Sequence, residues 1–375
     1  MSAKSGSSQY SAAIIGHTGE GDYGHGLDTV YGDMPEVEVM AVADADEEGL
    51  AAAGERTGAR RLYADYRVML GKEKVDLVNI GPRAVGERVD MVTACAEAGV
   101  RAVFCEKPMA ATLREADTML EACERHGMKM AVAHRRANPY EQHAKELVDL
   151  GEIGELQVIR AHGKWDRRSG AEDLAVLGTH MMDSMRYLAG ADVEWVHGHI
   201  TQDGREVTAA DAREGAEGIG RIAGNRVAAY YVFANGVTGH FESNPGDTQR
   251  RLNSRWLGFE AHGTQGIITV RNSPEGEMYL YRCGLWVPDG AVQWERVLLE
   301  QWEQIPQGER THRSNQIIVR ELIEAMEAGT QVVEASSGYD ARAALEMIMA
   351  VHESQRLQGR VSLPLTNRDN PYAAA

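Results

Sequence analysis

Residues 100–108 read V-R-A-V-F-C-E-K-P, and this stretch indicates the fold class of the chain. Val100–Cys105 is an apolar run without regular alternation, which is typical of a strand buried on both faces of a parallel sheet. Glu106, Lys107 and Pro108 follow, and Pro108 cannot continue a central strand. Ligands of open α/β sheets bind beyond the carboxyl ends of the strands. An isolated Lys-Pro pair is better explained as a solvated charge, but a glycine-rich loop upstream and a His-x-x-Asp motif downstream favour a ligand site here.

Length and composition predict a two-domain protein in the cytoplasm. The chain has 375 residues, more than one ordinary domain, and 43% of them are hydrophobic. There is no run of 18 apolar residues and no secretion signal, so we expect no membrane partner. The formal net charge of −17 argues against binding nucleic acid. The 4 cysteines form no C-x-x-C pair and no H-x-x-x-H occurs, so we expect reduced thiols and no metal site.

The first third of the chain alternates short apolar runs with helical patterns, which is typical of a doubly wound parallel sheet. We expect a disordered segment at residues 1–10 and a Rossmann dinucleotide-binding domain at residues 11–135. The expected strands are Ser11–Gly16, Val37–Ala43, Val75–Ile80, Val100–Cys105 and Lys129–Ala133. The expected helices are Asp22–Asp33, Glu47–Thr57, Tyr66–Gly71, Val85–Ala98 and Leu113–His126.

After a helix expected at Pro139–Leu150, the pattern changes to strands joined by hairpin-type turns. Residues 136–335 are expected to form an α+β domain for substrate binding and oligomerisation, with an open, largely antiparallel sheet covered by helices on one face. Residues 336–375 are expected to pack back near the first domain, and Gly204–Asn225 is expected to be a loop insertion. The expected strands are Leu156–His162, Val193–Ile200, Arg226–Phe233, Val237–Glu242, Arg255–His262 and Gly266–Arg271. The expected helices are His180–Leu188, Ser314–Ala328 and Asp340–Gln358.

The first strand leads into a glycine-rich loop, G-H-T-G-E-G-D-Y-G-H-G at residues 16–26. It contains G-x-G-x-x-G between an expected strand and an expected helix, which is the context of a dinucleotide fingerprint. Glycines let the backbone approach a pyrophosphate, and the N-terminus of the helix expected at Asp22 would point toward it. The loop is therefore predicted to bind a dinucleotide through Gly16, Thr18, Gly19 and Gly21.

Asp44 ends the second strand, where an acidic residue binds the ribose hydroxyls of a dinucleotide. A carboxylate there repels a 2′-phosphate, so NAD is expected in preference to NADP. The alternative is that Asp44 caps the following helix. Pro82 and Arg83 follow the third strand and are expected near the nicotinamide. Arg83 is equally suited to orient an anionic substrate or to pair with Glu87, and the sequence leaves these options open.

Together these residues resemble those of the Gfo/Idh/MocA family of NAD(P)-dependent sugar and polyol oxidoreductases. The matching motifs are E-K-P at 106–108, G-E-I-G-E at 151–155, G-x-H-x-x-D at 178–183 and G-T-Q-G at 263–266. The resemblance implies a Rossmann domain followed by an open-faced sheet domain, with the substrate between them. Because that sheet often mediates oligomerisation in the family, we expect a homodimer or homotetramer.

By this resemblance Lys107 corresponds to the family's catalytic lysine and His180 to its substrate-facing histidine, while Glu106 and Lys107 are also assigned to the cofactor site. A lysine is suited to stabilise a developing alkoxide. A histidine near neutral pKa is suited to move the hydroxyl proton. Asp183 shares a helix face with His180 and is able to orient the imidazole or to bond a substrate hydroxyl.

The chain departs from the family pattern at two places. Many relatives have Asp four residues before the histidine, where this chain has Val176. Glu172 and Asp173 lie one helical turn earlier and are candidates to replace it. Pro82-Arg83 stands where relatives more often have Pro-Asn. These departures predict a specialised member whose substrate is not a simple inositol or free sugar.

Further substrate contacts are predicted in the second domain. The stretch H-G-K-W-D-R-R at 162–168 follows its first strand. Trp165 offers a stacking surface for a sugar ring, and Lys164 and Arg168 offer hydrogen-bonding groups. A surface loop of ordinary mixed charge explains each of these residues equally well. Arg136 occupies a position that borders the active site in relatives.

We therefore expect an NAD-dependent oxidoreductase that moves a hydride between a secondary hydroxyl of a sugar, polyol or glycoside and the nicotinamide, with Lys107 and His180 handling the proton. The main alternative is a glycoside-cleaving enzyme that uses tightly bound NAD in a cycle of oxidation, elimination and reduction. A third reading is an NAD-sensing protein without catalysis, and the intact Lys107 and His180 count against it.

Overall fold

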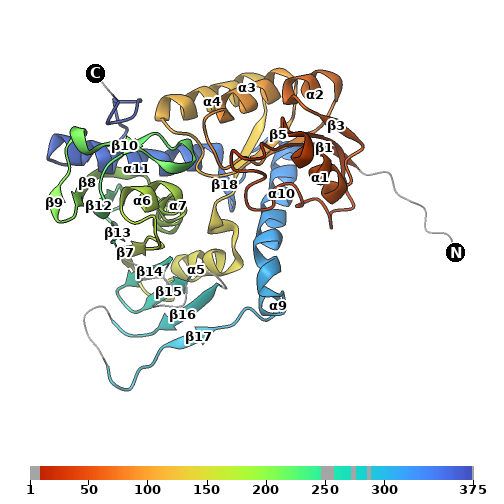
Figure 1. Ribbon diagram of the computed structural model, residues 1–375. Helices are drawn as coiled ribbons and strands as arrows, with labels where there is room; N and C mark the ends of the chain where they lie inside the picture. Colours follow the sequence, from red (N-terminus) through yellow and green to blue (C-terminus); the bar gives the residue numbers. More distant parts are fainter. Residues whose placement is uncertain (1–8, 246–256, 272–275, 285–288, 374–375) are drawn as a thin grey trace. The chain divides into compact units, whose positions relative to one another are not determined.

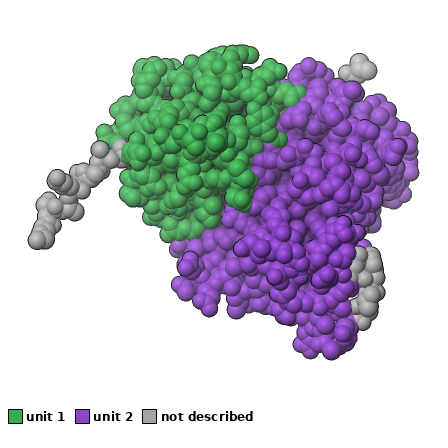
Figure 2. Space-filling view, turned by 180° about the vertical axis from the view of Figure 1, so that it is seen from behind, with its two compact units in different colours: residues 1–110, 115–133, 311–339 green, residues 111–114, 134–310, 340–375 purple. Residues whose placement is uncertain are grey.

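A computed structural model describes residues 9–245, 257–271, 276–284 and 289–373 of the chain (Figure 1). By its internal contacts the chain divides into two compact units, which Figure 2 colours separately. Unit 1 comprises Met1–Ala110, Glu115–Ala133 and Thr311–Tyr339. Unit 2 comprises Ala111–Arg114, His134–Arg310 and Asp340–Ala375.

Unit 1 is built on a seven-stranded sheet with the order β18-β6-β5-β4-β1-β2-β3. All neighbouring strands are parallel except β18, which pairs antiparallel with β6. The strand order reverses beside β1, as in a doubly wound Rossmann sheet, so the predicted fold class is confirmed. Each residue of β4 and β5 is buried, as the apolar run predicts. The strands are β1 (Tyr10–Ile15), β2 (Val37–Ala43), β3 (Arg61–Tyr63), β4 (Leu77–Ile80), β5 (Ala102–Cys105), β6 (Lys129–Val132) and β18 (Ser336–Ser337).

The helix predicted at Asp22–Asp33 is wrong. Residues 23–33 form consecutive turns between β1 and β2 rather than an α-helix. Gly24 and Gly26 have φ angles of 62° and 77°, far from the helical value, so the backbone cannot propagate a regular helix through them. The other helices of this region form where they are expected: α1 (Glu47–Thr57), α2 (Tyr66–Lys72), α3 (Arg88–Glu97) and α4 (Leu113–His126).

The two C-terminal helices belong to the opposite units from those that the sequence suggested. Most of α10 (Arg310–Ala328) lies in unit 1, where Gln316 Nε2 donates to the carbonyl of Val30 at 3.1 Å. Most of α11 (Gly338–Leu357) lies in unit 2, where Ser354 Oγ accepts from Gly198 N at 2.9 Å. Of the segment 336–375, only residues up to Tyr339 belong to unit 1. Periodicity shows that a helix has an apolar face but not which sheet that face meets.

Unit 2 is built on a ten-stranded sheet with the order β17-β16-β15-β14-β7-β13-β12-β8-β19, and β9 also pairs with β8. Only the β7–β13 pair is parallel, so the predicted largely antiparallel sheet is confirmed. The strands are β7 (Leu156–His162), β8 (Val193–Gln202), β9 (Arg205–Glu206), β12 (Arg226–Phe233), β13 (Thr238–Ser243), β14 (Gly258–Gly263), β15 (Ile267–Arg271), β16 (Glu277–Tyr281), β17 (Glu295–Val297) and β19 (Val361–Ser362).

One face of this sheet is covered by helices and the other is partly exposed. Along β12, buried residues alternate with exposed or half-buried ones. The covering helices include α5 (Pro139–Asp149), α6 (Ala171–Val176), α7 (Gly178–Ala189) and α11, and Figure 1 shows α6 and α7 stacked against the strands. On the open face the ring of Tyr230 lies 5.5 Å from that of Trp195 and 5.0 Å from that of His240.

Several short elements had no sequence signal strong enough to predict them, namely β3, β16, β17 and α6. The insertion Gly204–Asn225 is not a plain loop, because it carries β9, η2 (Ala209–Asp211), β10 (Arg213–Glu214), η3 (Ala216–Gly218) and β11 (Arg221–Ile222). Of the segment 1–10 that is predicted to be disordered, residues 1–8 lie outside the described residues, as do the first two residues of the strand Arg255–His262. The prediction is wrong for Tyr10, which begins β1. Within the part of the chain that the structure describes, no helix is long and apolar enough to cross a membrane.

Candidate active site

The predicted nucleotide-site residues of unit 1 come together at one edge of its sheet. Strands β1, β2, β4 and β5 are parallel, so their carboxyl ends meet at the same edge. The residues that follow them there are Gly16, Thr18, Gly19 and Gly21 after β1, Asp44 after β2, Pro82 and Arg83 after β4, and Glu106 and Lys107 after β5.

Glu106 is the buried anchor of this edge. Its side chain is 0% exposed, and its carboxylate accepts from the backbone N of His25 at 3.0 Å and lies 3.0 Å from His25 Nδ1. Burial acts to raise the pKa of Glu106, but the charge and hydrogen bonds of His25 and the charge of Lys107 outweigh it and lower the pKa to about 2. A Cβ on Gly24 would lie 2.3 Å from Glu106 Oε2, so only glycine fits there. An ionised carboxylate thus ties the glycine loop to the end of β5.

Lys107 is almost fully buried beside this carboxylate, and its backbone N donates to Glu106 Oε1 at 3.1 Å. Arg88, at the start of α3 and 1% exposed, donates to the carbonyl oxygens of Pro82 and Pro108. One guanidinium therefore joins the segments that follow β4 and β5. Lys107 is fixed by this joint rather than left as a mobile surface charge.

Asp44 is a buried acceptor at the end of β2. Its carboxylate accepts from Thr18 N at 3.1 Å, Thr18 Oγ1 at 2.7 Å, Tyr23 OH at 2.8 Å and Asp46 N at 3.0 Å. Burial acts to raise the pKa of Asp44, but these hydrogen bonds prevail and hold the pKa below its usual value. The alternative role of capping the next helix falls to Asp46, which accepts from Gly49 N at 2.7 Å.

The glycine loop and Asp44 fit an NAD-type dinucleotide in shape and charge. A Cβ on Gly16 would lie 2.1 Å from the Tyr23 ring, and one on Gly21 would lie 2.4 Å from Arg83 N, so the backbone packs too closely for side chains. Gly19, with φ 89°, faces open space and leaves the backbone accessible. Because residues 23–33 form turns, loop N–H groups rather than a helix N-terminus would meet the phosphates. A ribose diol would replace the hydroxyls of Thr18 and Tyr23 on Asp44.

Arg83 is half exposed at the same edge. Its guanidinium lies 3.9 Å from Asp22 of the glycine loop. Glu87, the partner considered from the sequence, lies instead 3.9 Å from His17 Nδ1. The guanidinium of Arg83 therefore faces the glycine loop, and its predicted contact with the nicotinamide stays a prediction.

In unit 2, His180 lies in a buried polar cluster on α7. Its ring meets that of His134 edge to face, with centroids 5.6 Å apart, and His134 Nε2 lies 3.0 Å from Thr179 Oγ1. Asp183 is 1% exposed, and its carboxylate lies 3.6 Å from His134 Nδ1. The sequence suggested that Asp183 orients His180. In the structure, His134 lies against both of these side chains.

Arg136 closes this cluster from η1 (Arg135–Ala137). Its guanidinium lies 3.4 Å from Asp183 and 2.7 Å from Asp340, and it stacks over the Tyr187 ring at 5.0 Å. Burial acts to lower the pKa of Arg136, but the two carboxylates outweigh it and raise the pKa. Arg136 thus positions Asp183, and its predicted contact with substrate would require this pairing to open.

The carboxylates suggested as replacements for the aspartate missing at Val176 are engaged elsewhere. Asp173, 0% exposed, accepts from Lys164 N at 3.1 Å, Trp165 N at 3.1 Å and Ser243 Oγ at 2.6 Å. Burial raises the pKa of Asp173 above its usual value despite these bonds. The Glu172 carboxylate lies 2.9 Å from the guanidinium of Arg213.

Asp173 instead shapes the loop that carries the other predicted substrate residues. Trp165 has a φ angle of 53° and donates from Nε1 to the carbonyl of Glu242 at 2.9 Å. Burial and the positive charge of Arg168 lower the pKa of Lys164. The Arg168 guanidinium is bonded to Asp166 at 3.1 Å. The structure therefore gathers Lys164, Trp165 and Arg168 on one ordered loop.

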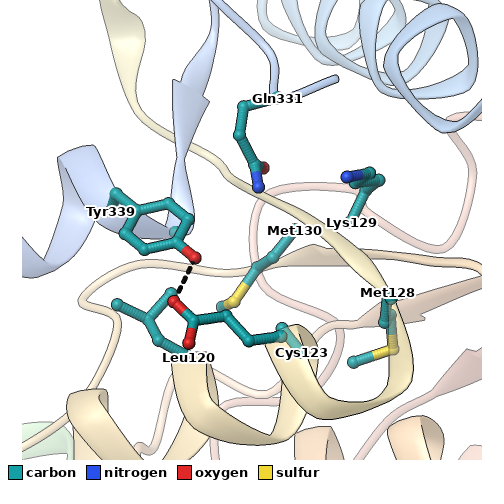
Figure 3. A pocket seen from close by; sticks show the side chains of 10 residues that line it. Leu120, Cys123, Met128, Lys129, Met130, Gln331 and Tyr339 are labelled. Carbon is teal, nitrogen blue, oxygen red and sulfur yellow. Dashed lines mark hydrogen bonds between the residues drawn. The ribbon is translucent and has the colours of Figure 1, made fainter. Parts of the chain in front are cut away.

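A pocket of about 200 Å³ in unit 1 lies away from the candidate site (Figure 3). It adjoins the amino end of β6, whereas Lys107 follows the carboxyl end of the parallel strand β5. Tyr339 OH closes one side by donating to Glu124 at 2.6 Å. Because dinucleotides bind at the carboxyl ends of the strands, this pocket is not the nucleotide site.

Sequence reasoning missed residues that act through other residues. They are His25, Arg88, His134, Asp173 used as a loop anchor, and Asp340. His25 had a usable signal, because it stands inside the glycine loop. Arg88 and Asp340 had none, since a charged residue near the start of a helix is usually solvated.

The fold and both motif clusters define a Rossmann-type oxidoreductase chain with an additional sheet domain, and comparisons with known proteins agree. The family model described as an oxidoreductase family with an NAD-binding Rossmann fold matches residues 11–134. The model of the GFO/IDH/MocA C-terminal domain matches residues 142–269. The chain therefore belongs to the Gfo/Idh/MocA family, as the sequence resemblance predicts.

The proteins similar to this chain include two curated dehydrogenases and one solved structure. D-apiose dehydrogenase of Paraburkholderia graminis is 37% identical over 169 residues, which cover 42% of this chain and 44% of that protein. Levoglucosan dehydrogenase of Pseudarthrobacter phenanthrenivorans is 26% identical over 63% of this chain and 66% of its own length. The chain thus spans less than half of the first relative and about two thirds of the second. A structure of levoglucosan dehydrogenase with NADH and levoglucosan has a TM-score of 0.74 at 22% identity, covering 95% of this chain and 100% of that one.

Replacing Glu106 by Gln tests the buried anchor. The pKa of Glu106 is lowered from 4.5 to about 2 by folding, so its contribution to stability is complete above pH 4.5 and is lost as the pH falls toward 2. We expect Glu106→Gln to lower the free energy of unfolding at neutral pH by on the order of 3 kcal/mol. The difference in unfolding free energy between the variant and the wild type should become smaller as the pH falls from 4.5 toward 2. Urea unfolding at a series of pH values measures this difference.

Glu97→Gln on the exposed face of α3 is the matched control and should leave the stability profile unchanged. A Glu106→Gln gap that stays constant across the acidic range would contradict the assignment of an ionised, buried carboxylate.

Proposed function

We propose that the protein moves a hydride between a secondary hydroxyl of a sugar, polyol or glycoside and the nicotinamide of NAD. The observation that carries this proposal is Lys107, buried at the carboxyl end of β5 and fixed between the ionised Glu106 and the Arg88 joint. A buried cation at this edge is suited to the oxygen of a reacting alcohol. The two curated relatives are named as dehydrogenases of D-apiose and levoglucosan, which supports a carbohydrate substrate.

In this proposal Lys107 Nζ donates a hydrogen bond to the reacting oxygen and stabilises the alkoxide character that develops on it. His180 accepts the hydroxyl proton during oxidation and returns it during reduction. When bound, NAD supplies the acceptor for the hydride. The alcohol loses a hydride from carbon and a proton from oxygen, and it becomes a ketone or, at an anomeric carbon, a lactone. His134 contacts the His180 ring and Asp183 approaches His134, so these two residues position the imidazole of His180.

Substrate hydroxyl groups would be bound by the ordered loop of unit 2. Trp165 offers an apolar ring face, and Lys164 and Arg168 offer donors. Asp183 is a further acceptor. Asp173 holds this loop by accepting two of its backbone N–H groups, which keeps the binding groups in place before substrate arrives.

A second candidate function is glycoside cleavage with retained NAD, by transient oxidation, elimination and re-reduction. The observation that favours it is the valine at position 176, where many relatives have an aspartate that partners the histidine. The carboxylates of Glu172 and Asp173 do not replace this aspartate, because they have other partners. The two candidates differ in one product: the first forms NADH in proportion to substrate, and the second forms none.

We also propose a homodimer or homotetramer built through the open face of the unit 2 sheet. Trp195, Tyr230 and His240 form a row of adjoining rings on that face. Half-exposed aromatic rings are typical of the central part of subunit interfaces.

Replacing Lys107 by Met tests the catalytic assignment. Methionine keeps much of the side-chain volume but cannot donate to an alkoxide, so we expect kcat/KM to fall by at least about 10²–10³-fold. NAD affinity, measured by fluorescence titration, should change little. Lys129→Met is the control, because Lys129 begins β6 at the opposite end of the strands. Unchanged turnover in Lys107→Met would overturn the assignment.

The ionised Asp44 predicts a nucleotide preference. Its charge disfavours the 2′-phosphate of NADP, so we expect kcat/KM with NAD to exceed that with NADP by at least about tenfold. Asp44→Ser should narrow this ratio by removing the charge. A wild-type preference for NADP would contradict the role given to Asp44.

The proposed interface predicts that the wild type is a dimer or tetramer in light-scattering measurements at micromolar concentration. Tyr230→Lys places a charge in the row of rings and should shift the mass toward that of the monomer. A monomeric wild type would rule the interface out.

A further inference from the structure

A cavity of about 360 Å³ in unit 2 lies between the loop after β7, helix α6 and the η3 segment of the insertion. Its size falls in the range of about 300–1,000 Å³ that is usual for small-molecule sites. The lining residues are Arg167, Arg168, Glu172, Val176, Ala216 and Glu217. We name this cavity the insertion pocket.

The insertion pocket lies close to His180 along the chain. Val176 ends α6 and Gly178 begins α7, while Leu177 between them keeps right-handed helical angles, with φ −106° and ψ −38°. Val176 precedes His180 by four residues, which corresponds to a rise of about 6 Å along a helix. This is about one helical turn, so the pocket wall at Val176 and the predicted catalytic histidine belong to two consecutive helices of unit 2.

The pocket offers hydrogen-bond donors and acceptors together. Arg167 is exposed and makes no ion pair with any described residue, so its five N–H donors are available. Glu217 Oε2 is buried and lacks a hydrogen-bond partner among the described residues. An unsatisfied carboxylate oxygen of this kind requires a donor such as a hydroxyl group.

The backbone at Glu217 gives a second, independent indication. Its φ angle is 58°, in the left-handed region that glycine or asparagine adopts more easily. Gly218 and Gly220 beside it have φ angles of 71° and 79°, so glycine is already used in this turn where the backbone requires it. A glutamate held in a strained backbone conformation is typical of a functional side chain.

The charges of the pocket select against an anion. Arg168 is bonded to Asp166, and Glu172 pairs with Arg213. The negative charge of Glu217 acts on Arg168, but among the described residues neither Arg167 nor Glu217 makes a direct ion pair. An anionic ligand group would be attracted by Arg167 but repelled by Glu217, whereas a neutral diol satisfies both. Val176 and Ala216 add an apolar wall of the kind that the C–H faces of a sugar ring contact.

We propose that the insertion pocket binds a second, neutral polyhydroxyl unit. The substrate of the proposed oxidoreductase is then a glycoside, such as a disaccharide, rather than a free monosaccharide or an acidic sugar. This inference rests on the proposed function for the reacting unit and adds the identity of its neighbour. Arg167 donates to the hydroxyl oxygens of the second unit, and Glu217 accepts from its hydroxyl groups.

The test compares paired sugars on the full-length protein. The panel contains glucose, galactose and glucuronate with the disaccharides maltose, cellobiose, lactose and trehalose. Kinetics give kcat/KM for each sugar with NAD, and saturation-transfer NMR measures sugar binding without turnover. We expect at least one neutral disaccharide to exceed its monosaccharide by about tenfold or more in kcat/KM, and glucuronate to be the poorest ligand.

Arg167→Ala and Glu217→Gln should each lower the ratio of disaccharide to monosaccharide kcat/KM by about tenfold, the loss expected for one hydrogen bond to a charged group. Glu214→Gln, in the same insertion but outside the pocket lining, is the matched control and should leave the ratio unchanged. Ratios unchanged in both pocket variants, or a free monosaccharide as the best substrate, would overturn the inference.

The binding arm separates this inference from the proposed function. If no sugar is oxidised but disaccharide signals in the NMR experiment are lost in the pocket variants, the pocket stands and the oxidoreductase proposal falls. If sugars are oxidised and no variant alters selectivity or binding, the oxidoreductase proposal stands and the pocket inference falls.

Discussion

The nucleotide-site edge of unit 1 depends on one buried carboxylate, that of Glu106. It is ionised, it receives the backbone N–H of His25 and that of Lys107, and it occupies the space that only a glycine at residue 24 leaves free. A buried charge is costly unless it is paired, and here the pairing joins the glycine loop to the end of β5. The order of the loop and the position of the lysine are therefore consequences of the same interaction.

In unit 2, buried charged side chains are likewise paired with one another, and more residues take part. Arg136 is buried between Asp183 and Asp340, and Asp183 also approaches His134, whose ring meets that of His180 edge to face. This network holds His134 and, through it, His180. Its buried charged groups would each cost free energy if they were left unpaired. In the loop after β7, Asp173 performs the equivalent task by accepting backbone N–H groups. The polar residues nearest the proposed chemistry are thus held in place by buried charged neighbours.

The sequence was sufficient for the fold class of both sheets, because the apolar run before Glu106 and the alternation along β12 have simple physical meanings. It failed at Asp22–Asp33, where apolar periodicity suggested a helix and two left-handed glycines prevent one. It also failed to assign α10 and α11 to their units, since a periodic pattern does not identify the partner surface. The role of Arg88 could not be predicted from the sequence, because its buried hydrogen bonds to two carbonyl groups exist only after folding.

The central claim is redox chemistry on a carbohydrate, and the most direct measurement uses the protein as purified with no nucleotide added. Bound cofactor would be released by denaturation and identified, while intact protein is incubated with sugars, polyols and glycosides and both nicotinamide absorbance and product mass are followed. We expect exchangeable NAD and NADH formed in proportion to oxidised sugar. Cleaved glycoside with retained NAD and no net NADH would contradict it and establish the cycling mechanism instead.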